Sequence, residues 1–160
     1  MPAKWLRPKG WSAMTLTQAD AQFVIGRSKV DPDYFWASIL GCNTVYPKQL
    51  EMARAVRDHN RVAVVGANGT GKDWQAARVM LWWMATRSPA ICVVLGPTHR
   101  QVSDIVWKEA RSAYLISRMG LGGQMFRTAR WEYDDRRYAV GFSTDNEYNI
   151  QGFHSPNLLV

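Results

Sequence analysis

Three glycines and a lysine lie close together in residues 66–72, which read GANGTGK. Glycine lets the backbone adopt positive φ and approach a ligand closely, so successive backbone N–H groups can converge on phosphate oxygens. The ammonium group of Lys72 can then neutralise the β and γ phosphates of a nucleotide. The spacing predicts a phosphate-binding loop made of Gly66, Ala67, Asn68, Gly69, Thr70, Gly71 and Lys72.

Such a loop needs a strand before it and a helix after it, and the flanking sequence predicts both. Residues 62–65 form a short apolar run rich in valine, which is typical of a strand buried on both faces of a parallel sheet. Residues 74–86 lack glycine and proline and are mostly apolar, as expected of a buried helix. The positive N-terminal end of that helix would face the bound anion.

Asp73 follows the lysine, at a position where serine or threonine normally offers a hydroxyl to Mg²⁺. A carboxylate can bind Mg²⁺ directly or through water, because hard cations prefer oxygen ligands. An acidic residue in the first turn also interacts favourably with the helix dipole, which would leave the metal to other groups. Asp73 is therefore a candidate Mg²⁺ ligand, and its role as a helix-start residue stays open.

Twelve residues separate Gln49 from the predicted loop strand at residues 62–65, and Gln49 lies in a helix that Pro47 opens. Its amide presents a donor and an acceptor together, which suits paired hydrogen bonds with the edge of an adenine. The alternative is an exposed glutamine in a first helical turn. We expect Gln49 to contact the base of a bound ATP, with Mg²⁺ as the accompanying metal.

The chain has 160 residues, of which 47% are hydrophobic, so one domain with a substantial core is expected. The net charge of +7 favours a polyanionic partner such as nucleic acid, although a solvated basic surface would give the same value. The two cysteines and three histidines are scattered, which predicts free thiols in a reducing cytosol and argues against zinc. No apolar run has membrane-spanning length, so no membrane partner is expected.

Other segments predict the rest of an α/β fold. Residues 91–95 predict a second buried strand, and Thr98 with Gln101 predicts the capped start of a helix that ends by Gly120. We expect a mostly parallel sheet with flanking helices, joined by an antiparallel hairpin over residues 131–142 and a strand starting at residue 158. Further helices are predicted over residues 18–25, over residues 32–40 and from Pro47 through Arg57. Asp31 can cap the second of these, and Pro32 suits its first helical position. Four arginines cluster around the hairpin: Arg127, Arg130, Arg136 and Arg137. They could contact DNA or phosphates, or they could be the charges that ordinarily protect a sheet edge from pairing with another strand, and we weigh the two equally.

These motifs together resemble the large terminase subunit of tailed bacteriophages, the P-loop ATPase that drives viral DNA packaging. The resemblance rests on YPKQLEMARAV, VVGANGTGKD, VVLGPTHRQV and IQGFHSPNLLV, and it covers residues 34–160. It implies a leader segment over residues 1–33 and a partial P-loop NTPase-like domain over residues 34–160. Family members continue the strand at Leu158 into an acidic Asp-Glu pair, which would lie beyond Val160. The domain would therefore be incomplete at its C-terminus, and its catalytic residues are left unassigned.

The resemblance also implies partners and limits. Family members act on double-stranded DNA with a portal protein and a small terminase subunit, as homo-oligomeric rings when full length, in the cytoplasm of the infected host cell. Their nuclease domain has no counterpart in residues 1–160, and the arginine finger is unassigned, because Ala67, Asn68 and Gln151 stand where members carry it. The truncated chain is expected to be inactive as an ATPase alone. Two other hypotheses are a different helicase-like, nucleic-acid-dependent ATPase and a non-catalytic remnant that acts only through partner binding.

Overall fold

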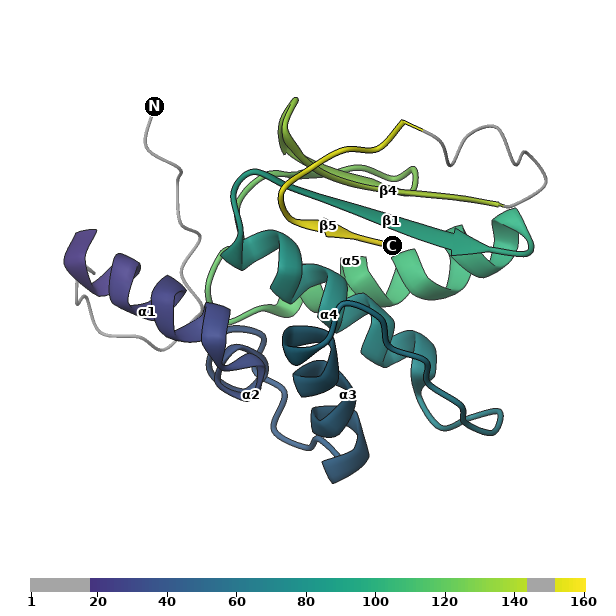
Figure 1. Cartoon of the computed structure of the whole chain (residues 1–160), viewed down its shortest axis with the longest axis horizontal. Coiled ribbons are helices and arrows are strands. Elements are labelled where there is room, and N and C mark those ends of the chain that lie inside the picture. Colours follow the sequence, from purple (N-terminus) through teal and green to yellow (C-terminus); the bar gives the residue numbers. More distant parts are fainter. Residues whose placement is uncertain (1–17, 144–151) are drawn as a thin grey trace.

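A five-stranded sheet forms the centre of the fold in the computed structural model, which describes residues 18–143 and 152–160. The strand order is β2-β3-β4-β1-β5. Helices lie along the sheet, with α4 and α5 next to the strands (Figure 1). The protein is therefore an α/β protein, as the sequence predicts. The strands are β1 (Ala90–Gly96), β2 (Gln124–Met125), β3 (Arg130–Asp134), β4 (Arg137–Ser143) and β5 (Leu158–Leu159).

The sheet is mixed, and the prediction of a mostly parallel sheet is wrong. β1 pairs in parallel with β4 and with β5. The other two pairings, β2 with β3 and β3 with β4, are antiparallel. The hairpin causes the difference, because strands joined by a tight turn can only run antiparallel, whereas parallel neighbours need a long crossover. The predicted hairpin itself and the strands at residues 91–95 and 158 are confirmed.

Helical segments account for most of the remaining described chain. The α2 helix passes directly into η1, and η2 into α5, so two predicted helices begin or continue as wider π-type turns. Asp31 caps α2 through a 3.0 Å hydrogen bond that its side chain accepts from the Tyr34 N–H, as predicted. The helical segments are α1 (Gln18–Val30), α2 (Pro32–Tyr34), η1 (Phe35–Ile39), α3 (Pro47–Asp58), α4 (Lys72–Thr86), η2 (Gln101–Val106) and α5 (Trp107–Ile116).

The first helix is longer than predicted. It passes through Gly26, where the sequence predicts an end, and continues to Val30. Glycine inside a helix costs only about 1 kcal/mol relative to alanine, so tertiary contacts can outweigh it. One such contact lies beyond the glycine, where the buried indole N–H of Trp82 donates a 2.6 Å hydrogen bond to the Ser28 carbonyl. This bond joins the second half of α1 to α4.

Residues 62–65 do not form the predicted strand. They run as an irregular connection between α3 and α4. Val62, Val64 and Val65 are 38%, 46% and 99% exposed, whereas the prediction places them inside a sheet. A β-branched run gains little from an extended conformation unless a neighbouring strand supplies hydrogen bonds and an apolar face. Both sides of β1 are already occupied, by β4 and β5, so this segment has no place beside it.

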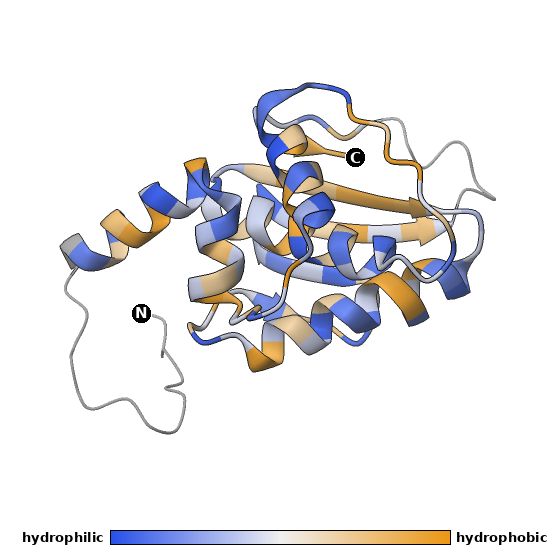
Figure 2. Ribbon diagram, turned by 90° about the horizontal axis from the view of Figure 1, so that it is seen from below, coloured by the Kyte–Doolittle hydropathy of each residue, from blue (hydrophilic) through white to orange (hydrophobic). Residues whose placement is uncertain are grey.

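Tryptophans dominate the core between the helices and the sheet. Trp36, Trp82, Trp107 and Trp131 are fully buried and come from four different elements. Hydrophobic residues also line the central strands (Figure 2), where β1 has a continuous buried stretch from Ala90 to Val93. Large aromatic side chains bury much apolar area each, so this small domain obtains its core from few residues.

One position of β4 depends on having no side chain. Val102 of η2 and the indole ring of Trp107 lie directly over Gly141, so a methyl group there would overlap both. The glycine therefore lets η2 and α5 approach the sheet closely. Val102 is 2% exposed and Trp107 is fully buried, which leaves neither side chain free space to move into.

Gly141→Ala should lower the free energy of unfolding by about 1 to 3 kcal/mol, because an added methyl group overpacks a filled core. Chemical denaturation would measure the change. Gly26→Ala, within α1, is the matched control, since apart from its chain neighbours and the helix's own backbone no atom of the described residues lies within 4 Å of the position its Cβ would take. The control should be neutral or stabilising by up to about 1 kcal/mol. Equal midpoints for parent and Gly141→Ala would contradict the packing described.

Candidate functional site

The predicted phosphate loop connects α3 to α4 and projects from the body of the protein (Figure 1). Residues 61–70 are all exposed, so backbone groups of the loop are accessible to a ligand. Gly69 and Gly71 have φ of 78° and 79°, the left-handed region that glycine adopts without a steric penalty. Gly71 is also the N-cap of α4. The positive φ that the sequence predicts is thus found at Gly69 and Gly71 but not at Gly66.

Lys72 reaches back across the loop. Its Nζ donates 2.6 Å hydrogen bonds to the carbonyl oxygens of Gly66 and Ala67. The hydroxyl of Thr70 donates to the Ala67 carbonyl as well, at 2.8 Å. The ammonium group is thus held against the loop by two neutral backbone carbonyls of exposed residues. An incoming phosphate would offer it charged oxygen acceptors, which form the stronger bonds.

The helix after the loop is anchored by aromatic contacts. The rings of Trp74 and Trp36 meet edge to face with centroids 5.9 Å apart, which ties the first turn of α4 to η1. The Arg78 guanidinium lies 3.7 Å from the centroid of the Trp74 ring, on its face, and is itself 6% exposed. A cation over an indole face is attracted by the ring quadrupole. The N-terminal end of α4 is therefore held firmly although the loop before it is exposed.

Asp73 lies in the first turn of α4 with an exposed side chain. In residues 18–143 and 152–160, no three His, Cys, Asp or Glu side chains gather into a site that could hold a metal by themselves. Asp73 is therefore a single carboxylate beside the loop. A metal there would need further oxygen ligands, which nucleotide phosphates and water can supply.

Gln49 is brought next to the loop, although it lies more than twenty residues away from Lys72 in the chain. It is 9% exposed, and its side-chain Oε1 accepts a 3.1 Å hydrogen bond from the Tyr46 N–H in the capping box of α3. A Cβ on Gly71 would lie 3.1 Å from the Gln49 Nε2. The amide nitrogen therefore borders the end of the loop, and Oε1 keeps a second lone pair. The alternative of an exposed glutamine is not what the structure has.

Sequence reasoning missed Gln75, which joins the two sides of this site. Gln75 is 4% exposed, and its Nε2 donates a 2.8 Å hydrogen bond to the backbone carbonyl of Gln49. The bond connects α4 to the first turn of α3. The only sequence signal for Gln75 is that it is a polar residue within an otherwise apolar helix. That signal does not show that its hydrogen-bond partner is the Gln49 carbonyl.

The hairpin arginines do not act as one cluster. Arg137 donates three hydrogen bonds of 2.6 to 3.0 Å to the carbonyls of Met84 and Ala85 at the end of α4, which is a structural role. Arg127 and Arg130 instead line a cavity between α5 and the sheet, and no residue of the loop lines it. Gln151, one candidate position for an arginine finger, lies outside the described residues.

Val160 marks the point beyond which the resemblance places the acidic pair. The strand that leads to it is confirmed, since β5 pairs in parallel with β1 at Ile91 and Cys92. Val160 follows that strand, is 68% exposed, and has an apolar side chain that can neither bind a metal nor orient water. The catalytic carboxylates stay a prediction for residues beyond Val160.

The cysteines are free thiols, as predicted. Burial raises the pKa of the Cys92 thiol to about 12. None of the helices in the described part of the chain has the length and apolar character needed to cross a membrane. Comparison with models of protein families, with curated proteins and with solved structures gives no match. The fold and the loop thus define an α/β protein with an exposed glycine-lysine loop at the start of a buried helix.

Gln75→Leu should lower the free energy of unfolding by about 1 to 3 kcal/mol, because it leaves the Gln49 backbone carbonyl without its buried partner. Gln124→Leu, on the exposed edge strand β2, is the control and should change stability by less than about 0.5 kcal/mol. Denaturant midpoints of the two variants give the comparison. Equal effects from both would mean that the bond between Gln75 and Gln49 does not stabilise the α3–α4 contact.

Proposed function

We propose that this chain binds ATP through the loop of residues 66–72. Gly66, Ala67, Asn68, Gly69, Thr70 and Gly71 would cradle the phosphates with backbone N–H groups, and Lys72 would neutralise them. The observation that carries the proposal is the conformation of the loop, with two left-handed glycines leading into α4 and the Lys72 ammonium bonded to the carbonyls of Gly66 and Ala67. The N-terminal end of a fifteen-residue helix adds favourable partial positive charge.

The base would lie toward α3. Gln49 borders Gly71, its Nε2 donates to no residue that the structure describes, and its Oε1 keeps a lone pair, so it can pair with an edge that offers both functions. Adenine has such an edge. Gln49 is held in place from two sides, by the Tyr46 N–H on its side-chain amide and by Gln75 on its backbone carbonyl, which favours a fixed orientation.

Mg²⁺ would be held by Asp73 together with oxygens of the nucleotide. The carboxylate is exposed and one residue from Lys72, so it can face the same phosphates. The ion would supply charge neutralisation for the phosphoryl group, while the residues of this chain bind and orient the nucleotide.

The wider role that we propose is in a viral DNA-packaging motor of the large terminase type. The order of the motifs supports this role: the adenine-side glutamine comes first, then the glycine-lysine loop, then the strand and turn at β1. The net charge of +7 also supports it, because a basic protein attracts a polyanion such as DNA. Double-stranded DNA, a portal protein and a small terminase subunit would be the partners. Another nucleic-acid-dependent ATPase of the helicase-like class is the alternative. Cleavage of DNA ends by a longer protein that contains this chain would favour the packaging role over that alternative.

Lys72→Ala should weaken ATP binding about tenfold to a hundredfold, because a lost charge-assisted contact costs about 1.5 to 3 kcal/mol. Isothermal titration of purified protein with ATP and Mg²⁺ measures it. Lys108→Ala removes the same charge from the exposed face of α5 and should bind ATP like the parent. Equal affinity for Lys72→Ala and the parent would refute the assignment of the loop.

Gln49→Ala should narrow the preference for ATP over GTP, because the amide matches one arrangement of donor and acceptor and not its reverse. Competition titrations of both nucleotides would give the ratio. Because Gln49 is buried, thermal unfolding of the variant without nucleotide provides the control for folding. A parent protein that binds ATP and GTP equally would show that Gln49 serves only as a helix cap.

A further inference from the structure

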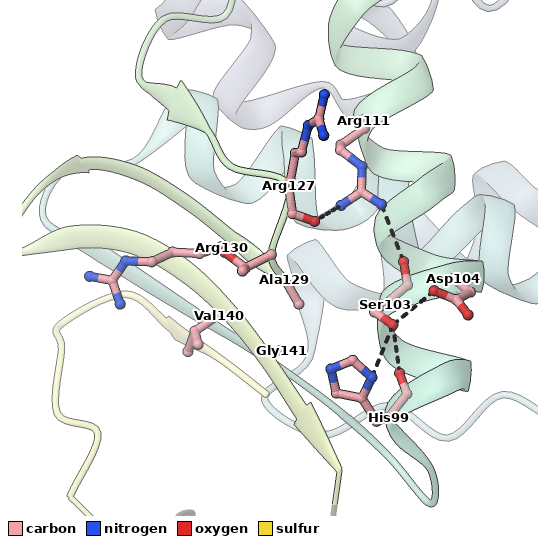
Figure 3. Close-up of a pocket in the computed structure, with 10 residues that line it drawn as sticks. His99, Ser103, Asp104, Arg111, Arg127, Ala129, Arg130, Val140 and Gly141 are labelled. Carbon is pink, nitrogen blue, oxygen red and sulfur yellow. Dashed lines mark hydrogen bonds between the residues drawn. The ribbon is translucent and has the colours of Figure 1, made fainter.

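A cavity of about 550 Å³ lies away from the loop, between η2, α5 and the strands β3 and β4. Figure 3 shows its two walls, with His99, Ser103 and Asp104 on the helical side and Arg130 with Val140 on the sheet side. Arg111 of α5 and Arg127, just before β3, lie at the upper end of the same cavity in that view. No residue of the proposed nucleotide loop lines it.

The charged side chains around this cavity are mostly positive. Its lining includes Arg111, Arg127 and Arg130, against one carboxylate, Asp104. Arg130 is paired with Glu132 at 2.7 Å, whereas Arg111 donates to the carbonyls of Arg127 and Ser103 at 3.0 and 3.4 Å. Because those two carbonyls are neutral, much of the positive charge is left uncompensated. A cavity with this excess attracts anions.

Arg127 differs from Arg111 and Arg130, whose guanidinium groups already have partners, and its own guanidinium lies at the upper end of the view in Figure 3. Its side chain is exposed and forms no hydrogen bond or ion pair with any other residue that the structure describes. Its backbone is fixed, because the Arg127 carbonyl accepts the bond from Arg111. A guanidinium on a fixed backbone presents several donors in a planar fork that matches two oxygens of a phosphate.

The floor of the cavity is rigid. Gly141 lies there under Trp107 and Val102, in contacts too close for any added methyl group. The indole N–H of Trp107 is buried and has no hydrogen-bond partner within the described residues. A rigid floor and a fixed Arg111 lower the cost of ordering the cavity around a ligand.

We propose that this cavity binds a phosphate group, with Arg127 and Arg111 as its main donors and Asp104 opposing the bound charge. The phosphate could belong to a nucleic-acid backbone or to a small phosphorylated molecule, since both offer the same oxygens. The site is separate from the proposed ATP site, because the two share no residue. It gives the chain a second anion-binding surface on the sheet side of α5.

The test uses the full chain carrying Lys72→Ala, so that the loop contributes little to phosphate binding. Pyrophosphate is titrated by calorimetry, and a fluorescein-labelled duplex DNA of about 20 base pairs by anisotropy at two salt concentrations. Arg127→Gln should weaken binding at least about tenfold. Asp104→Asn should strengthen it, because the variant removes the opposing charge and keeps the side-chain shape. Arg136→Gln, in the exposed β3–β4 turn, removes equal charge and is the matched control.

Each outcome decides the proposal. Weaker binding by Arg127→Gln and stronger binding by Asp104→Asn, for both probes, supports a site for a nucleic-acid backbone. The slope of the logarithm of the DNA-binding constant against the logarithm of salt concentration should then be smaller in Arg127→Gln by about one, the value for one phosphate contact. The same pattern for pyrophosphate alone supports a small phosphorylated ligand. Equal effects of Arg127→Gln and Arg136→Gln, or no binding of either probe to the parent, overturns the proposal. Parallel ATP titrations of the Arg127→Gln chain with Lys72 intact report on the loop separately.

Discussion

Burial of α4 is the constraint on which the rest of the structure depends. The helix contacts α1, the α3 region, η1, α5 and the sheet, and nine of its fifteen residues are buried. Its side chains also carry the polar connections, from Trp82 to Ser28 and from Gln75 to Gln49. Because a close-packed helix with satisfied polar groups can take few other positions, α4 sets where every neighbouring element lies.

The candidate nucleotide site follows from this arrangement. The loop is exposed and tied to the body at its second end, where Gly71 begins a helix that cannot easily move. Gln49 reaches the same place from α3, because Gln75 holds the first turn of α3 against α4. Phosphate, base and metal contacts would therefore be oriented by one contact between two helices. The first end of the loop has no comparable support, since residues 61–65 are exposed.

The sequence predicted those elements whose conformation is set by their own residues and near neighbours in the chain. Asp31-Pro32, Pro47 and the alternating residues of the hairpin each specify their own conformation, and the structure confirms all three. The segment 62–65 could not be predicted in the same way, because a strand exists only with a neighbour and the pattern does not say whether one is present. The assignment of the loop to ATP stays a prediction.

Long-range side-chain roles were also beyond the sequence. Arg137 was one of four hairpin arginines with the same expected role, yet it alone caps the end of α4. Gln75 and Arg111 had no distinguishing neighbours in the chain, and their roles depend on carbonyls 26 and 16 residues away. Such contacts are decided by packing in three dimensions, which residue type and spacing do not encode.

The exposed valines of residues 62–65 have a consequence for how the chain exchanges hydrogen with solvent. No backbone–backbone hydrogen bond is formed by residues 61–66 with any described residue outside their own segment, so their amides should exchange at nearly the rate of an unfolded peptide. The amides of α4, a few residues further on, open only with the core. One short stretch of chain would therefore contain both the fastest and the slowest exchanging amides. Slowing confined to residues 62–65 on adding a ligand or another protein would report directly that this segment had gained a neighbouring strand.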